Sequence, residues 1–192
     1  MQSISLLVGL GNPGLEYEYT RHNFGFYLLD ALVAHKNASW VSDVKCRALT
    51  ASVTVGQKKL MCLKPQTFMN SSGVSVQAFC RYYKIEPSTV MVVCDDISIP
   101  FGDFKISTIP GSAGHNGVKS IAAHIGSNFS RYRMGLGTKP PFMALNDYVL
   151  ARFSEDELVR LGSIATVFVE NIESIVDKGI RKALNVIKRG VS

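Results

Sequence analysis

Hydrophobic residues recur along the chain at two different spacings. Residues 23–35 carry apolar side chains three and four positions apart, which is typical of a helix with one buried face. Residues 90–94 form a continuous apolar run, which is typical of a central strand covered on both faces. By the same patterns we expect strands at 4–8, 103–109 and 131–136, a hairpin at 46–64, and helices at 74–83, 118–125, 154–168 and 172–187.

Strands that alternate with helices predict an α/β protein. The hairpin adds an antiparallel pair, so we expect a twisted, mixed β-sheet flanked by helices. The 192 residues fit one domain with a sizeable core, over residues 1–192, in which 154–192 form a C-terminal helical segment. In the strand at 131–136, alternation predicts that Tyr132 and Met134 point inward and that Arg131 and Arg133 point outward.

Composition narrows the functional class. No run is long and apolar enough to cross a bilayer, and the N-terminus has no basic segment followed by an apolar one, so we expect a soluble, cytoplasmic protein without membrane contact. A net charge of +6 weakly favours an anionic partner. The cysteines lack C-x-x-C spacing and are expected to be buried, reduced thiols rather than zinc ligands or disulfides; they are Cys46, Cys62, Cys80 and Cys94.

The first predicted strand runs into a glycine-rich turn at 9–14. This turn matches G-x-G-x-x-G, and Asp30 follows at the distance expected of a ribose-binding acid. A dinucleotide site needs a helix that opens inside the glycines, whereas Pro13 indicates a turn and Glu16 and Glu18 would repel phosphate. Asp30 also falls inside a helical pattern. We therefore expect a turn that carries polar side chains, not a nucleotide fold.

Polar residues follow four of the expected strands, where α/β sheets usually place their sites. A carboxylate such as Asp95 and a histidine such as His22 can form a general-base pair: the acid fixes one ring nitrogen and the other accepts a proton from water. Asn12, Asn70 and Asn116 could donate to a carbonyl oxygen that becomes negative. Each signal also has a structural reading, because loop asparagines form turns and aspartates cap helices.

Four motifs, in this order, resemble those of bacterial peptidyl-tRNA hydrolases. They are Gly9-Leu10-Gly11-Asn12-Pro13-Gly14 with Tyr17 and 20–25, then 64–73, 95–102 and 111–121. The resemblance runs from the first strand to about Phe153. It implies a monomeric esterase, with no metal or other cofactor, that cuts the ester between a peptide and the 3′-terminal ribose of tRNA.

The resemblance also implies roles for single residues. His22 is the general base, Asp95 is the carboxylate that holds it, and Asn12 or Asn70 helps to polarise the ester carbonyl. The other side chains of the implied site contact the peptide and the terminal adenosine or line the groove beside them: Tyr17, Phe68, Asn70 and Asn116.

Two positions depart from the family pattern. Ser98 stands where an acidic residue is usual, and Ser107 stands where a basic residue and a partner matching Arg133 grip the 5′ phosphate of tRNA. We therefore expect weaker tRNA binding and a shallower salt dependence than a two-cation clamp gives. The cations that could compensate are Lys105, Lys119, Arg131 and the basic tail at 178–189, although Arg131 and Arg133 would also suit a solvated strand face.

Several alternatives stay open at this point. The chain could be a non-catalytic RNA-binding relative that kept the groove but lost turnover. A cysteine hydrolase using Cys94 is disfavoured, because a thiol in an apolar strand has a raised pKa. His115 and His124 are interpreted as structural or supporting residues rather than as a second base. The sequence leaves open whether the loop at 138–143 closes over a substrate.

Overall fold

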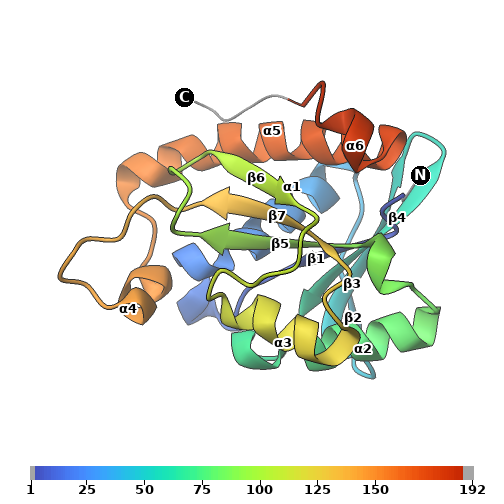
Figure 1. Ribbon diagram of the computed structural model, residues 1–192, viewed down its shortest axis with the longest axis horizontal. Coiled ribbons are helices and arrows are strands. Elements are labelled where there is room, and N and C mark those ends of the chain that lie inside the picture. Colours follow the sequence, from blue (N-terminus) through green and yellow to red (C-terminus); the bar gives the residue numbers. More distant parts are fainter. Residues whose placement is uncertain (1–2, 188–192) are drawn as a thin grey trace.

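A seven-stranded mixed sheet forms the centre of the protein in the computed structural model, which describes residues 3–187 (Figure 1). Its order is β2-β3-β4-β1-β5-β7-β6. β4, β1, β5 and β7 are parallel, while β2–β3, β3–β4 and β6–β7 pair antiparallel. The strands are β1 Leu6–Gly9, β2 Val41–Asp43, β3 Ala48–Val55, β4 Lys58–Pro65, β5 Val90–Asp96, β6 Phe104–Ser107 and β7 Ser130–Gly135. The expected mixed α/β sheet is confirmed.

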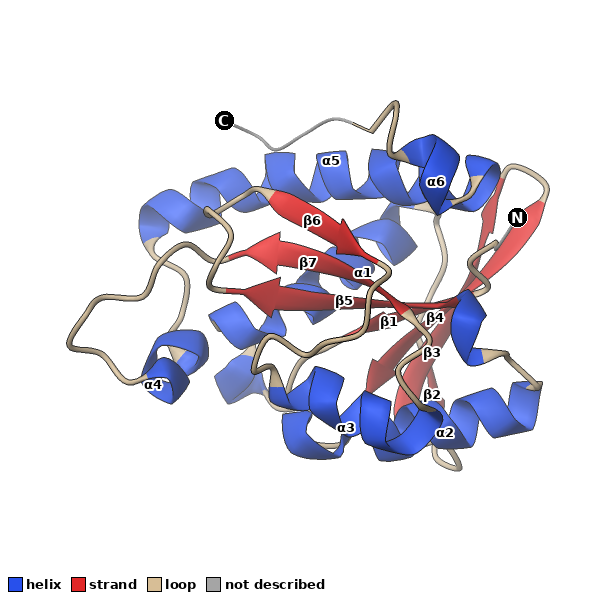
Figure 2. Cartoon of the chain, in the orientation of Figure 1, coloured by secondary structure: helices blue, strands red, loops and turns tan. Residues whose placement is uncertain are grey.

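Helices cover both faces of the sheet (Figure 2). α1 and α5 pack on one face, and α2 and α3 pack on the other. The α-helices are α1 Phe24–His35, α2 Ser72–Tyr83, α3 Asn116–Ile125, α4 Leu145–Leu150, α5 Glu155–Lys178 and α6 Ile180–Ala183. Short 3₁₀ turns lie at η1 Leu15–Tyr17, η2 Arg21–Asn23, η3 Met69–Ser71 and η4 Pro87–Thr89. No described helix is long and apolar enough to span a membrane.

The central strand β5 supplies side chains to two separate cores. Met91 and Val93 join the core under α1 and α5, whereas Val90 and Val92 join the core under α2 and α3. Successive side chains of a strand point to opposite faces, so a strand covered on both faces has a continuous run of apolar residues in its sequence. The interpretation of residues 90–94 is therefore confirmed, and the strand carries Asp95 and Asp96 to its end.

The glycine-rich turn also behaves as expected. The segment after β1 forms the 3₁₀ turn η1, and the first α-helix begins only at Phe24. Asp30 lies within α1, where its carboxylate pairs with Lys64 at 2.5 Å. The cysteines are free and buried, as predicted.

Three details of the prediction were wrong or incomplete. β2 and α4 have patterns too short to be recognised, since three and six residues give little periodicity. The helix expected at 172–187 is the end of α5, which stops at Gly179, where φ is 79°, followed by the short α6. The basic positions 188 and 189 of the expected tail lie outside the described residues.

Arg131 was expected to point into solvent, but residues 109–111 fold over it and it is only 6% exposed.

Gly73 tests the close contact between α2 and α3. A Cβ at this position would lie 2.2 Å from the Ser120 carbonyl oxygen, so Gly73→Ala must push the helices apart. We expect a loss of about 1–3 kcal/mol in the free energy of unfolding, measured in urea. Gly162→Ala in α5 is the control: no heavy atom lies within 4 Å of its Cβ position, so better helix propensity should stabilise it by about 0.5–1 kcal/mol. Equal effects would contradict this packing.

Candidate active site

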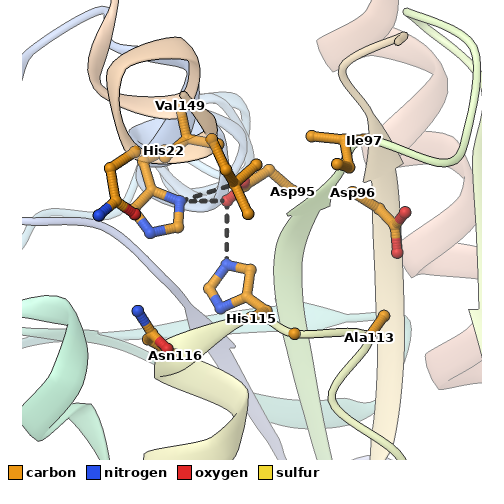
Figure 3. Close-up of a pocket in the computed structure, with 11 residues that line it drawn as sticks. His22, Asp95, Asp96, Ile97, Ala113, His115, Asn116 and Val149 are labelled. Atoms are coloured by element: carbon orange, nitrogen blue, oxygen red, sulfur yellow. Dashed lines mark hydrogen bonds and ion pairs between the residues drawn. The ribbon is translucent and has the colours of Figure 1, made fainter. Parts of the chain in front are cut away.

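The candidate site lies where β1, β4 and β5 end, at the edge of the sheet that Figure 3 shows in close-up. η2 carries His22, the end of β5 carries Asp95, and the loop before α3 carries His115. A small cavity there is lined by these three side chains together with Asn116. The carboxyl ends of parallel strands therefore gather groups from distant parts of the chain, as is usual in α/β sheets.

His22 and Asp95 are in direct contact. His22 Nδ1 lies 3.0 Å from Asp95 Oδ1 and 3.1 Å from Oδ2, and the Asp95 side chain is only 4% exposed. A buried carboxylate accepts hydrogen bonds, so it places the proton of the neutral imidazole on Nδ1. The opposite nitrogen, Nε2, then keeps a lone pair and makes no hydrogen bond with any described residue.

His115 holds the same carboxylate from the other side. Its Nε2 lies 3.0 Å from Asp95 Oδ1 (Figure 3). Its Nδ1 accepts from the backbone N–H groups of Gly117 at 3.1 Å and Val118 at 3.4 Å, and so caps the start of α3. A nitrogen that accepts carries no proton, so Nε2 must carry it and donate to Asp95. This geometry gives His115 the supporting role that the sequence favoured, rather than that of a second base.

The spacing of these side chains would also suit a metal ion, because ligand atoms of His22, Asp95 and His115 lie within 4.8 Å of one another. A metal needs an unprotonated nitrogen. The helix cap puts the His115 proton on Nε2, which is the nitrogen that faces the others. The donor set therefore fits a hydrogen-bonded triad better than a metal site.

Opposite effects act on the pKa values of the pair. Burial raises the pKa of Asp95, but the adjacent imidazoles of His22 and His115 and their hydrogen bonds hold it well below its usual range. Burial lowers the pKa of His22, yet the charge of Asp95 and the hydrogen bond to it outweigh burial and raise the pKa above 6.5. The site therefore holds an ionised acid beside an imidazole whose protonated form is stabilised.

Asn12 is fixed by the turn around it. Its Oδ1 accepts from the Met69 N–H at 2.8 Å, its backbone N–H donates to Asn23 Oδ1 at 2.8 Å, and Asn23 Nδ2 donates to its carbonyl at 2.9 Å. These contacts leave the Nδ2 end of the Asn12 amide to meet a ligand. Asn23 had no predicted role, although it lies inside the motif at 20–25; its reciprocal hydrogen bonds with the backbone of Asn12 hold the turn in place.

Of the other expected site residues, only Asn116 is among those that line this cavity. Asn116 lines the cavity with His22, whereas Asn70 is exposed at η3 and does not line it. Tyr17 and Phe68 contact each other edge to face, with ring centroids 6.2 Å apart, and the Phe68 ring is largely exposed. Three residues that line the cavity were not predicted. They are Leu145, Asn146 and Val149 of α4, a helix too short for its pattern to be recognised.

Arg133 lies beyond this cavity and is already paired. Its Nε and Nη2 lie 2.8 and 2.6 Å from Asp96 Oδ2, and its Nη1 lies 3.3 Å from Ser107 Oγ. Asp96 Oδ1 in turn accepts from the N–H and the hydroxyl of Ser98, at 2.8 and 2.5 Å. The two departures from the family pattern, Ser98 and Ser107, thus flank one ion pair. Lys105 and Arg133 line a second cavity of about 420 Å³.

Cys94 does not suit a nucleophile. It is 3% exposed and belongs to the core under α2 and α3. Burial and the adjacent carboxylate of Asp95 raise the pKa of its thiol far above neutrality. The cysteine-hydrolase alternative has no support in this geometry.

Comparison with known proteins gives one consistent result. The family model "Peptidyl-tRNA hydrolase" matches residues 6–191. Peptidyl-tRNA hydrolase from Gloeobacter violaceus is 39% identical over 184 residues, covering 95% of this chain and 93% of its own. The enzyme from Clostridium acetobutylicum is 39% identical over 181 residues, covering 94% and 95%. The crystal structure of peptidyl-tRNA hydrolase from Acinetobacter baumannii has a TM-score of 0.91 at 32% identity, covering 99% of this chain and 97% of its own.

The titration of His22 tests the contact with Asp95. We expect its NMR titration midpoint to lie above 6.5, and to fall below 6.5 in Asp95→Asn, because burial remains while the carboxylate charge is lost. Since the folded pKa is raised, this pair stabilises the fold fully below pH 6.5, and the contribution is lost as pH rises through the folded pKa. An unchanged midpoint in a folded Asp95→Asn variant would show that the carboxylate does not act on His22.

Proposed function

The chain belongs to the peptidyl-tRNA hydrolase family and hydrolyses peptidyl-tRNA, and we propose that His22 is the general base of this reaction, held by Asp95. The assignment rests on a difference between the two ring nitrogens of His22. Nδ1 is bound to a buried carboxylate, while Nε2 makes no bond with a described residue. That arrangement keeps one nitrogen available to accept a proton.

In the proposed reaction, Nε2 of His22 removes a proton from water as the water oxygen attacks the ester carbonyl carbon. The C–O bond to the 3′-ribose oxygen then breaks, and the imidazolium returns the proton to that oxygen. The products are a peptide with a free carboxyl group and tRNA. Asp95 stabilises the transient imidazolium and keeps the ring oriented, while His115 and the α3 backbone keep Asp95 in place.

The carbonyl oxygen gains negative charge in this step, so the site needs neutral donors. Asn12 is a candidate donor, because its oxygen accepts from the Met69 N–H and its amide nitrogen remains available. It lines a separate cavity of about 690 Å³ and not the one that His22 lines, so a substrate would have to reach both. Asn116 lines the cavity of His22 and is proposed to contact the peptide or the terminal adenosine. Asn70 is exposed at η3 and is proposed to contact the peptide or the terminal adenosine of a bound substrate.

The remaining assignments concern the tRNA. Tyr17 and Phe68 form an exposed aromatic edge that supports a role in lining the groove for the 3′ end. Lys105 and Arg133 line the second cavity and are proposed to face the phosphates of the tRNA. Monomeric action and a cytoplasmic location are further parts of the proposal, on the strength of the family alone.

Removal of the His22 imidazole tests the assignment. His22→Ala should lower the rate of peptide release from labelled peptidyl-tRNA by about 10²–10⁴-fold, because general-base assistance is lost while the binding surface stays intact. In the wild type, kcat/KM should rise with pH through the raised pKa of His22, above pH 6.5.

The control is His35→Ala, since the His35 side chain is 59% exposed at the end of α1. It should retain wild-type turnover. Wild-type turnover in His22→Ala would refute the base assignment. A non-catalytic RNA-binding relative would bind peptidyl-tRNA and release no peptide even as the wild type.

Substitution of Ser107 tests whether this position faces the phosphates of the tRNA. Ser107→Lys should tighten tRNA binding and steepen the dependence of log K on log salt by about one unit, as expected for one added phosphate contact. Ser107→Met is the control for side-chain length without charge. Binding and salt slope that are the same in Ser107→Lys and in the wild type would show that position 107 does not face the RNA.

A further inference from the structure

Arg21 precedes His22 in η2, and the proposed reaction gives it no role. Its backbone N–H donates to the Ala151 carbonyl at 3.0 Å, and Thr20 forms an isolated antiparallel bridge with Arg152. The backbone that carries His22 is therefore paired with the segment between α4 and α5. The Arg21 side chain adds to this connection, because its Nη1 donates to the Arg152 carbonyl at 2.8 Å.

The guanidinium of Arg21 also reaches the first turn of α5. Its Nη2 forms an ion pair with Glu157 Oε2 at 2.6 Å, and the two side chains are only 12% and 17% exposed. The same Glu157 oxygen accepts from the Ser154 N–H at 2.7 Å, in the capping box that begins α5. Water and salt screen a pair that is partly buried less than a pair on the surface. The ion pair therefore fixes Arg21 to the start of α5.

Arg21 contacts α4 as well. The central carbon of its guanidinium lies 4.7 Å from the centroid of the Tyr148 ring, a distance suited to a cation–π contact. The Tyr148 hydroxyl donates to the Leu136 carbonyl at 2.7 Å, so this ring is itself held in place. Val149, the next residue of α4, lines the candidate cavity together with His22 (Figure 3). One side chain thus connects the element that carries His22 with a helix of the cavity wall.

We propose that Arg21 is a positioning residue for the hydrolysis, and that its ion pair with Glu157 sets the place of His22 relative to Asp95 and to α4. Arg21 is not among the residues that line the cavity, so it acts through the backbone of η2 and not on the substrate. A general base must lie within hydrogen-bond reach of its water, and a misplacement of about 1 Å can cost about 10²-fold in rate. This inference rests on the proposed role of His22 and adds the contact that maintains its position.

The experiment measures the kinetics and the His22 titration of Arg21→Gln. We expect kcat for peptidyl-tRNA hydrolysis to fall about 10–100-fold, with a KM within about twofold of the wild-type value. The NMR titration midpoint of His22 should fall too, because a misplaced ring loses part of the Asp95 interaction that raises its pKa. Loss of the Arg21 charge, acting through space alone, would instead raise that midpoint. The sign of the shift therefore separates positioning from direct electrostatics.

Glu157→Gln tests the same ion pair from its other side and keeps an oxygen that can accept from the Ser154 N–H. It should lower kcat and the His22 midpoint in the same directions. Combined with Arg21→Gln it should be no worse than Arg21→Gln alone, because the two partners of one ion pair are not additive. Two matched controls should keep wild-type values: Glu155→Gln removes a charge from the same turn of α5, and Arg152→Gln keeps the carbonyl that accepts from Arg21.

Four results would overturn the proposal: wild-type kcat and midpoint in folded Arg21→Gln, a fall in kcat with an unchanged midpoint, a raised midpoint, or a rise in KM alone. If Arg21→Gln does not fold, Glu157→Gln decides by the same criteria. The titration is measured without substrate, so it does not depend on turnover. Wild-type turnover in His22→Ala would refute the base assignment and leave the effect of Arg21 on the His22 midpoint standing, so the two failures are distinguished.

Discussion

The buried carboxylate of Asp95 is the constraint on which the site depends. An ionised group that is 4% exposed survives only if its oxygens are hydrogen-bonded, and here two imidazoles donate to it, each at 3.0 Å. This requirement fixes the tautomers of both histidines. It also orients the His22 ring so that the opposite nitrogen, Nε2, makes no hydrogen bond with a described residue.

His115 reaches Asp95 from the start of α3. His115 caps α3 with one nitrogen and holds Asp95 with the other, so the start of that helix and the end of β5 are tied together. The turn after β1 is tied in the same manner by Asn23, which holds Asn12 through its backbone. The scaffold therefore positions Asp95 and Asn12 before a ligand arrives, which lowers the cost of ordering the site.

Two adjacent acids at the end of β5 hold different partners. Asp95 and Asp96 are neighbours on β5, so their side chains leave the strand on opposite faces. Asp95 contacts His22 and His115 (Figure 3). Asp96 instead forms an ion pair with Arg133. The end of one strand therefore fixes both the histidine contacts of Asp95 and the ion pair of Asp96.

The sequence by itself determined the sequence of elements and the nature of the central strand, because the spacing of apolar residues reports which faces of an element are covered. Its motifs also pointed to His22, Asp95 and Asn12. Only the tertiary structure decided how these groups meet, that His115 caps a helix, and that Arg131 is buried under residues 109–111. Those contacts join segments far apart in the chain, and they depend on strand order and loop paths, which local periodicity does not encode. β2 and α4 were missed for a related reason: they are held by their neighbours and are too short to carry a pattern of their own.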